Sequence, residues 1–85
     1  MKIKEGYVLK EVADSYLVVA VGNAVKDFKG IITLNETGAF LWKELENDTD
    51  EESLVANLLD TYEVGESQAR KDVSTFIEKI KGKLF

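Results

Sequence analysis

The sequence has 85 residues, a formal net charge of −5 and 45% hydrophobic residues, and it contains neither cysteine nor histidine. This length supports one domain with a modest core, and the missing residue types exclude disulfides, thiolate chemistry, zinc–cysteine sites and histidine general bases. No window approaches ~18 uninterrupted apolar residues, and the N-terminus lacks a signal-peptide hydrophobic region. We therefore expect a cytoplasmic protein that does not enter a membrane.

Two apolar, β-branched runs near the N-terminus predict a β-hairpin. They are YVLKEV at 7–12 and YLVVAV at 16–21, separated by a short break at 13–15. The second run is almost wholly apolar, which favours a strand covered by helices. Gly22-Asn23 then signals a turn, and residues 24–29 (AVKDFK) are predicted as an irregular or weakly extended loop.

A third short run, IITL at 31–34, predicts a strand that passes directly into a helix. Strand alternation places Ile32 and Leu34 on one face of the sheet. Asn35 follows at once and is a strong N-cap candidate, because its side-chain oxygen can accept hydrogen bonds from the first helical turn. The first helix is predicted over 36–46.

Two more amphipathic segments follow the first helix. Thr49 to Glu52 has the pattern of a capping box, with Thr49 as the cap of a helix over 50–62. A third helix is predicted over 66–81, with Gly82 after its end. The apolar stripes of the three helices recur at helical spacing: Leu41, Trp42 and Leu45; Leu54, Val55, Leu58, Leu59 and Tyr62; and Ala69, Val73, Phe76, Ile77 and Ile80.

The clustered carboxylates do not indicate catalysis. Acid–base work needs carboxyl groups in a desolvated cleft, whereas Glu44, Glu46, Glu51 and Glu52 lie at predicted exposed helix ends. A cation site over 48–52 is the functional alternative, but it lacks the EF-hand spacing. The glycines match neither a P-loop nor a dinucleotide fingerprint. We expect no catalytic residues, no metal and no cofactor, and therefore no enzyme.

The charge is unevenly distributed, which bears on nucleic acid binding. Residues 44–63 carry eight acids and no base, whereas residues 64–85 carry five bases and three acids. Three helices with a small sheet are compatible with a winged helix-turn-helix, but the acidic second helix has the wrong sign for DNA. DNA binding stays open as an alternative that we do not expect.

The third strand is expected to leave one edge unpaired. Its run GIITL has no proline, lysine or glutamate, the usual defences of a sheet edge. An extended peptide can add to such an edge, with a helix groove giving selectivity. Peptide capture, a structural edge and an oligomerisation contact all remain open from these residues. Phe28, in the polar loop beside the run, is either a recognition aromatic or a core residue.

Several segments together resemble the PqqD-like family of RiPP recognition elements, which bind precursor peptides. These are GYVLKEV, YLVVAV and GIITLNETGAFLW, the helix pattern T-x-E-E-x-L-V, and Y-x-V-x-x-x-Q-A-x-x-D-V-x-x-F-I-x-K-I. The likeness covers about residues 5–84. It implies a single α+β domain over 1–85, winged helix-turn-helix-like, with a three-stranded antiparallel sheet followed by three helices.

The resemblance also implies a binding site and partners. Family members bind the leader segment of a precursor peptide as a further strand and present it to a modifying enzyme, a radical SAM protein in PQQ biosynthesis. Carried over by position, the docking strand comprises Gly30, Ile31, Ile32, Thr33 and Leu34. The helix face comprises Lys71, Ser74, Thr75, Ile77, Glu78 and Lys81.

The net positive charge of residues 64–85 leads us to expect an acidic leader beside Lys71 and Lys81. We expect a monomer, with an edge-strand or swapped dimer as the alternative.

Overall fold

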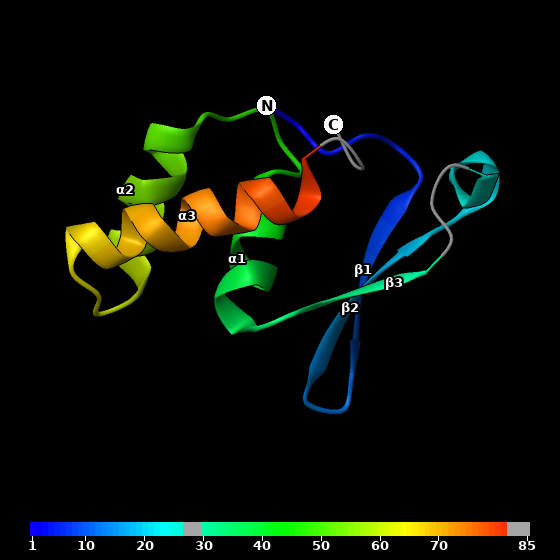
Figure 1. Cartoon of the computed structure of the whole chain (residues 1–85), viewed down its shortest axis with the longest axis horizontal. Helices are drawn as coiled ribbons and strands as arrows, with labels where there is room; N and C mark the ends of the chain where they lie inside the picture. Colours follow the sequence, from blue (N-terminus) through cyan, green and yellow to red (C-terminus); the bar gives the residue numbers. More distant parts are fainter. Residues whose placement is uncertain (27–29, 82–85) are drawn as a thin grey trace.

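The computed structural model describes residues 1–26 and 30–81 (Figure 1). Its elements are β1 (Tyr7–Val12), β2 (Ser15–Ala20), a 3-10 helix (Gly22–Lys26), β3 (Ile31–Leu34), α1 (Glu36–Glu44), α2 (Glu51–Thr61) and α3 (Glu66–Ile80). This order confirms the predicted α+β fold of a three-stranded sheet followed by three helices. The segment after β2 is a 3-10 helix as far as Lys26, rather than wholly irregular. None of the helices in the described ranges is long and apolar enough to cross a membrane.

The sheet is antiparallel throughout and has the strand order β1-β2-β3. A tight turn at Ala13-Asp14 joins β1 to β2, with Ala13 in the left-handed region (φ 54°), so that Ser15 belongs to the strand and pairs with Val12. In the second pair Leu17 lies opposite Thr33 and Val18 opposite Ile32. Within the described residues, β3 therefore pairs with β2 alone and forms an edge of the sheet.

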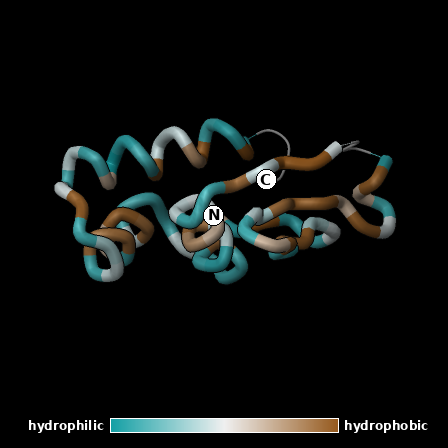
Figure 2. Tube along the Cα trace, turned by 90° about the horizontal axis from the view of Figure 1, so that it is seen from below, coloured by the Kyte–Doolittle hydropathy of each residue, from teal (hydrophilic) through white to brown (hydrophobic). Residues whose placement is uncertain are grey.

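One face of the sheet packs on the core and the other faces solvent. Ile32 and Leu34 are buried, while Ile31 is 61% exposed, which confirms the predicted alternation. On β2 only Val18 is fully buried, so this strand is covered less completely than its apolar run predicts. The reason is that the helices supply core on one side of the sheet only. In Figure 2 the strands carry long hydrophobic stretches, whereas α3 alternates along its turns.

The junction between β3 and α1 is formed by Asn35. Its backbone is extended (φ −82°, ψ −179°), and its Oδ1 accepts a hydrogen bond from the Gly38 amide at 2.7 Å, as predicted for an N-cap. The helix ends at Glu44 with Leu45 as its C-cap, two residues before the predicted end. Trp42 is 1% exposed and anchors the core.

The cap of α2 differs from the prediction. Asp50, not Thr49, is the N-cap, and its Oδ1 accepts from the Ser53 amide at 2.7 Å. The Thr49 amide instead donates to the Met1 carbonyl at 2.9 Å, which ties the preceding residue to the N-terminal segment. The helix consequently starts one residue later than the capping-box pattern indicates. Helix α3 ends at Ile80, and the predicted Gly82 cap lies outside the described residues.

The helices share one core with the inner face of the sheet. Helix α3 contributes Ala69, Val73, Phe76 and Ile80, all at most 5% exposed. Phe40, on the flank of α1, packs edge-to-face on Tyr62 with ring centroids 5.4 Å apart. This arrangement places α3 beside β3, where the two elements flank a groove.

Candidate functional site: the groove between β3 and α3

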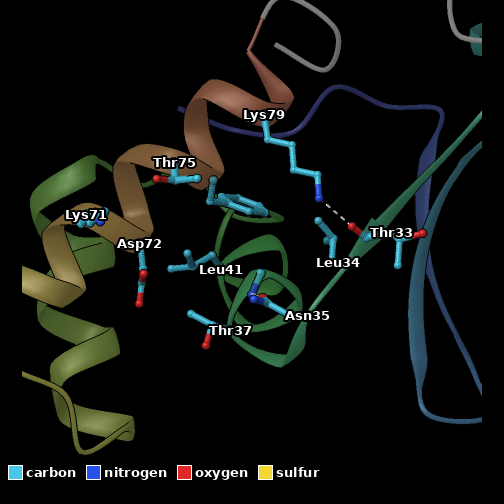
Figure 3. A pocket seen from close by; sticks show the side chains of 11 residues that line it. Thr33, Leu34, Asn35, Thr37, Leu41, Lys71, Asp72, Thr75 and Lys79 are labelled. Carbon is cyan, nitrogen blue, oxygen red and sulfur yellow. Dashed lines mark hydrogen bonds between the residues drawn. The ribbon is translucent and has the colours of Figure 1, made fainter.

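A groove of about 610 Å³ lies where β3, the start of α1 and α3 meet (Figure 3). Its lining combines an apolar floor with polar and charged walls. The lining residues are Thr33, Leu34, Asn35, Thr37, Gly38, Leu41, Lys71, Asp72, Thr75, Phe76 and Lys79.

The strand wall of the groove presents backbone groups. The Lys79 ammonium donates a hydrogen bond to the Thr33 carbonyl at 2.7 Å, and in Figure 3 it reaches β3 from the side away from β2. In an antiparallel strand the N–H and C=O of one residue point to the same side, and successive residues alternate. The backbone groups of Ile31 and Thr33 therefore face away from β2, while those of Ile32 and Leu34 face it.

The floor comes from α1 and the buried ends of β3 and α3. Leu34, Leu41 and Phe76 are each at most 5% exposed and form the apolar base of the groove. Gly38 lets the helix begin close to the strand. A Cβ at this position would lie 3.2 Å from Asn35 Oδ1 and 3.3 Å from Leu34 Cβ.

The helix wall carries the charge. Lys71, Thr75 and Lys79 follow one another at a spacing of four residues and so line the same flank of α3. Asp72, on the same flank, accepts a hydrogen bond from the Gln68 side-chain amide at 2.7 Å. The two lysines and one aspartate give the groove lining an excess of one positive charge.

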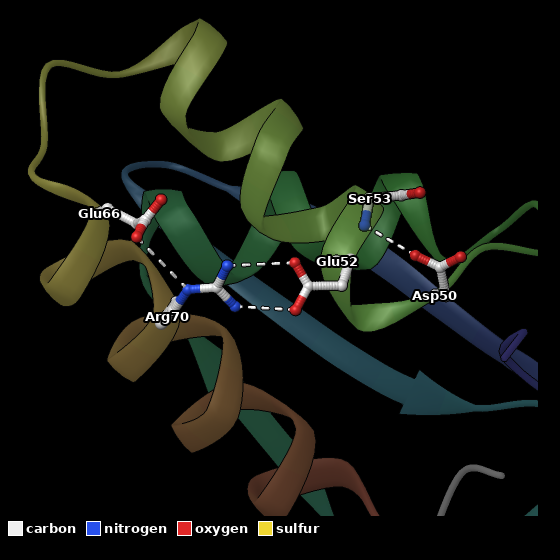
Figure 4. A network of polar contacts seen from close by, with 5 residues as sticks. All are labelled: Asp50, Glu52, Ser53, Glu66 and Arg70. Carbon is white, nitrogen blue, oxygen red and sulfur yellow. Dashed lines mark hydrogen bonds and ion pairs between the residues drawn. The ribbon is translucent and has the colours of Figure 1, made fainter.

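The opposite flank of α3 is held against α2 (Figure 4). Arg70 makes two hydrogen bonds to the Glu52 carboxylate, at 2.8 and 3.1 Å, and lies 3.8 Å from Glu66. The hydrogen bonds and charge of Arg70 lower the pKa of Glu52, and the Ser53 amide lowers the pKa of Asp50. The Arg70–Glu52 contact joins this flank of α3 to α2, while the flank that carries Lys79 lies toward β3.

The residues proposed from the sequence fall into three groups. Thr33, Leu34, Lys71 and Thr75 line the groove, and Ile31 and Ile32 lie on the same strand, just after Gly30. Other positions on α3 and after it do not line the groove: Ser74 and Glu78 are exposed, Ile77 is half-buried against the core, and Lys81 follows the helix. Phe28 lies outside the described residues.

Sequence reasoning did not include several lining residues, among them Asp72, Phe76 and Lys79. Phe76 is predicted mainly as a core residue, and in the structure it belongs to the core and lines the groove as well. A signal for Lys79 exists, because it is two helical turns beyond Lys71 on the same flank. The α1 residues Thr37, Gly38 and Leu41 have no such signal, because only the packing of α1 beside β3 brings them to the groove.

The chemistry of the groove suits an extended polypeptide. It combines outward backbone donors and acceptors on β3, an apolar floor and a partly basic wall. Residues 1–26 and 30–81 contain no group of three or more aspartate or glutamate side chains placed to hold a metal ion.

Two solved structures share this fold. One is TbiB1 in complex with the TbiA(beta) leader peptide, with a TM-score of 0.74 and 21% identity, covering 99% of this chain and 94% of that one. The other is lasso peptide synthetase B1 complexed with the leader peptide, with a TM-score of 0.73 and 15% identity, covering 98% and 93%. No curated protein matches the sequence.

The family comparison covers most of the chain. The model of coenzyme PQQ synthesis protein D (PqqD) matches residues 8–83, from β1 through α3, and so includes both walls of the groove. The chain therefore belongs to the PqqD family.

Proposed function

We propose that this protein binds the leader segment of a ribosomally made precursor peptide and presents it to a modifying enzyme. The observation that carries the proposal is the edge of β3, which pairs with no strand but β2 in the described ranges and lies beside a groove walled by α3. The two structures that share the fold are complexes with leader peptides. The leader adds to β3 as a fourth strand and lays alternate side chains on the groove floor.

Peptide affinity has to come from both the hydrogen-bonding edge of β3 and the apolar floor of the groove. The outward groups of Ile31 and Thr33 provide two donors and two acceptors, and each net hydrogen bond contributes only about 0.5–1.5 kcal/mol. Association and ordering of a flexible peptide offset much of that gain. Apolar peptide side chains on Leu34, Leu41 and Phe76 supply the remaining affinity.

The role is that of a binding protein in peptide maturation. A groove with an apolar floor, backbone hydrogen-bonding groups and a basic flank recognises a chain segment and positions it. Chemistry on the peptide then belongs to a partner enzyme, such as a radical SAM protein. The short edge strand leaves most of a bound precursor free to reach that enzyme.

The test is a titration of the isotope-labelled protein with candidate leader peptides, followed by NMR. We expect amide shifts at residues 30–34 and along α3 from 71 to 79. Shifts confined to β1 or to α2 would contradict binding at this groove. A precursor lacking its leader is the control and should leave the spectrum unchanged.

Proline at Thr33 tests strand addition directly. Thr33→Pro removes an amide that points away from β2, so the β2–β3 ladder survives. Peptide affinity should fall by about twofold to tenfold, which is the loss expected from one net hydrogen bond. Thr33→Val keeps the amide and is the matched control. Fluorescence of the buried Trp42 and circular dichroism verify the fold. Equal affinities for a folded pair of these variants would overturn strand addition.

A further inference from the structure

Lys79 donates a hydrogen bond to a backbone carbonyl on β3 that an added strand needs for pairing. Its Nζ lies 2.7 Å from the Thr33 carbonyl, a contact between residues 46 positions apart in the sequence. The carbonyl is on the open side of β3, where the backbone amide of a fourth strand would donate. A bound peptide and Lys79 therefore compete for the same oxygen.

Among the described residues that line the groove, Asp72 is the one acid that could receive Lys79. In the described ranges, ion pairs involve only Met1 and Arg70, so neither Lys79 nor Lys71 is paired with an acid. Asp72, the acidic residue in the groove lining, already accepts from Gln68. Among the described lining residues, an ammonium displaced from Thr33 thus finds only a carboxylate that Gln68 already engages.

We propose that Lys79 is an exchangeable latch that makes the site select peptides with an acidic side chain at one fixed position. In the free protein Lys79 covers the Thr33 carbonyl. On binding, a peptide amide takes that carbonyl, and the ammonium passes to a carboxylate on the peptide side chain that faces α3. The proposal rests on the proposed function and names the feature of the peptide that the site recognises.

Two physical effects give this exchange its selectivity. A hydrogen bond between an ammonium and a carboxylate is stronger than one between neutral groups. A peptide with an apolar or basic residue at that position covers Lys79 without giving it a partner, and an unpaired charge is costly to desolvate. The acid is favoured at a single position beside Thr33, and a net negative charge elsewhere on the peptide does not replace it.

The probe is a display library of random, cysteine-free peptides, selected on the full protein. Peptides selected by the wild type should show aspartate or glutamate enriched at one position relative to their apolar residues. K79M should reduce that enrichment to the library frequency, and K79E should replace it with lysine or arginine. K79R keeps the charge and should keep the preference, and K71M is the matched control on the same flank of α3.

A single selected peptide, made with glutamate or glutamine at the enriched position, gives the size of the effect. The wild type should bind the glutamate form about twofold to fivefold more tightly, and K79M should bind both forms equally. Two outcomes would overturn the latch alone. One is acid enrichment that persists in K79M, and the other is a wild type that selects apolar positions without any acid enrichment. If no peptide is selected by any variant, the proposed function itself fails, and the latch with it.

Discussion

Asn35 shows how one residue connects the strand wall of the groove to its floor. Its extended backbone ends β3, and its side-chain oxygen satisfies the Gly38 amide in the first turn of α1. No linker separates the two elements, so Leu34 and Leu41 are brought onto the same groove floor. The cap is therefore a structural residue that sets the shape of the binding site.

Replacing Asn35 with alanine removes this cap. We expect Asn35→Ala to lower the free energy of unfolding by about 1 kcal/mol, because the Gly38 amide loses its acceptor at the helix start. Urea denaturation followed by Trp42 fluorescence measures the change. Asn35→Asp retains an equally good cap and should keep nearly the full stability. A loss of the same size in both variants would contradict the capping role.

At the scale of elements, the position of α3 depends on contacts along both of its flanks. Arg70 pairs with Glu52 on α2, while Lys79 reaches Thr33 on β3. Buried Val73 and Ile80 lie between these flanks. Contacts on the α2 side therefore help to hold the groove wall on the β3 side.

The Glu52–Arg70 contact predicts part of the acid sensitivity of the fold. Arg70 lowers the pKa of Glu52 in the folded protein, so the folded state binds this proton less readily than the unfolded state does. The stabilisation that this contact gives the folded state is complete above the ordinary glutamate pKa of about 4.3. It is lost as the pH falls through the lowered pKa of Glu52. Denaturant titrations between neutral pH and about pH 3 should therefore show the wild type losing its advantage over Glu52→Gln.

A matched variant separates this contact from general charge effects. Glu46→Gln removes the same charge from an exposed position after α1. Its stability difference from the wild type should change less with pH than that of Glu52→Gln. Parallel pH profiles for the two variants would show that the Arg70 contact does not contribute to acid unfolding.

At the scale of the whole molecule, the distribution of charge favours peptide binding over DNA binding. The net charge is −5, and the eight acids of residues 44–63 lie on the end of α1, on α2 and in the adjoining loops. Arg70, one of the cations on α3, is already paired with Glu52. A phosphate backbone approaching α3 therefore meets the repulsion of α2 beside it.

We accordingly expect no binding to duplex DNA. In a gel-shift assay at low salt, protein at about 10⁻⁴ M should leave a short duplex unretarded, because the net charge of −5 and the acidic α2 repel the phosphate backbone. The same protein sample, titrated with leader peptide, is the control for activity. A salt-sensitive shift of the duplex would favour the winged-helix DNA-binding alternative.

The sequence by itself determined the elements and their inward faces. The alternation in IITL, the apolar stripes of the helices and the Asn35 cap are local patterns, and each appears in the structure as expected. The undefended edge of β3 is equally local, because it depends on the residues within the run itself. The cap of α2 does not follow from the local pattern, because Thr49 and Asp50 are both good N-cap residues. In the structure Asp50 caps the helix, and the Thr49 amide donates to the Met1 carbonyl.

Only the tertiary structure decided which flank of α3 forms the groove. Periodicity shows that Val73, Phe76 and Ile80 face inward, but it leaves two polar flanks that are equivalent in the sequence. In the structure the flank of α3 that carries Arg70 packs on α2, and the flank that carries Lys79 faces β3. The contact between Lys79 and Thr33 joins residues that only the fold brings together, because its geometry depends on how a helix is rotated against a distant strand.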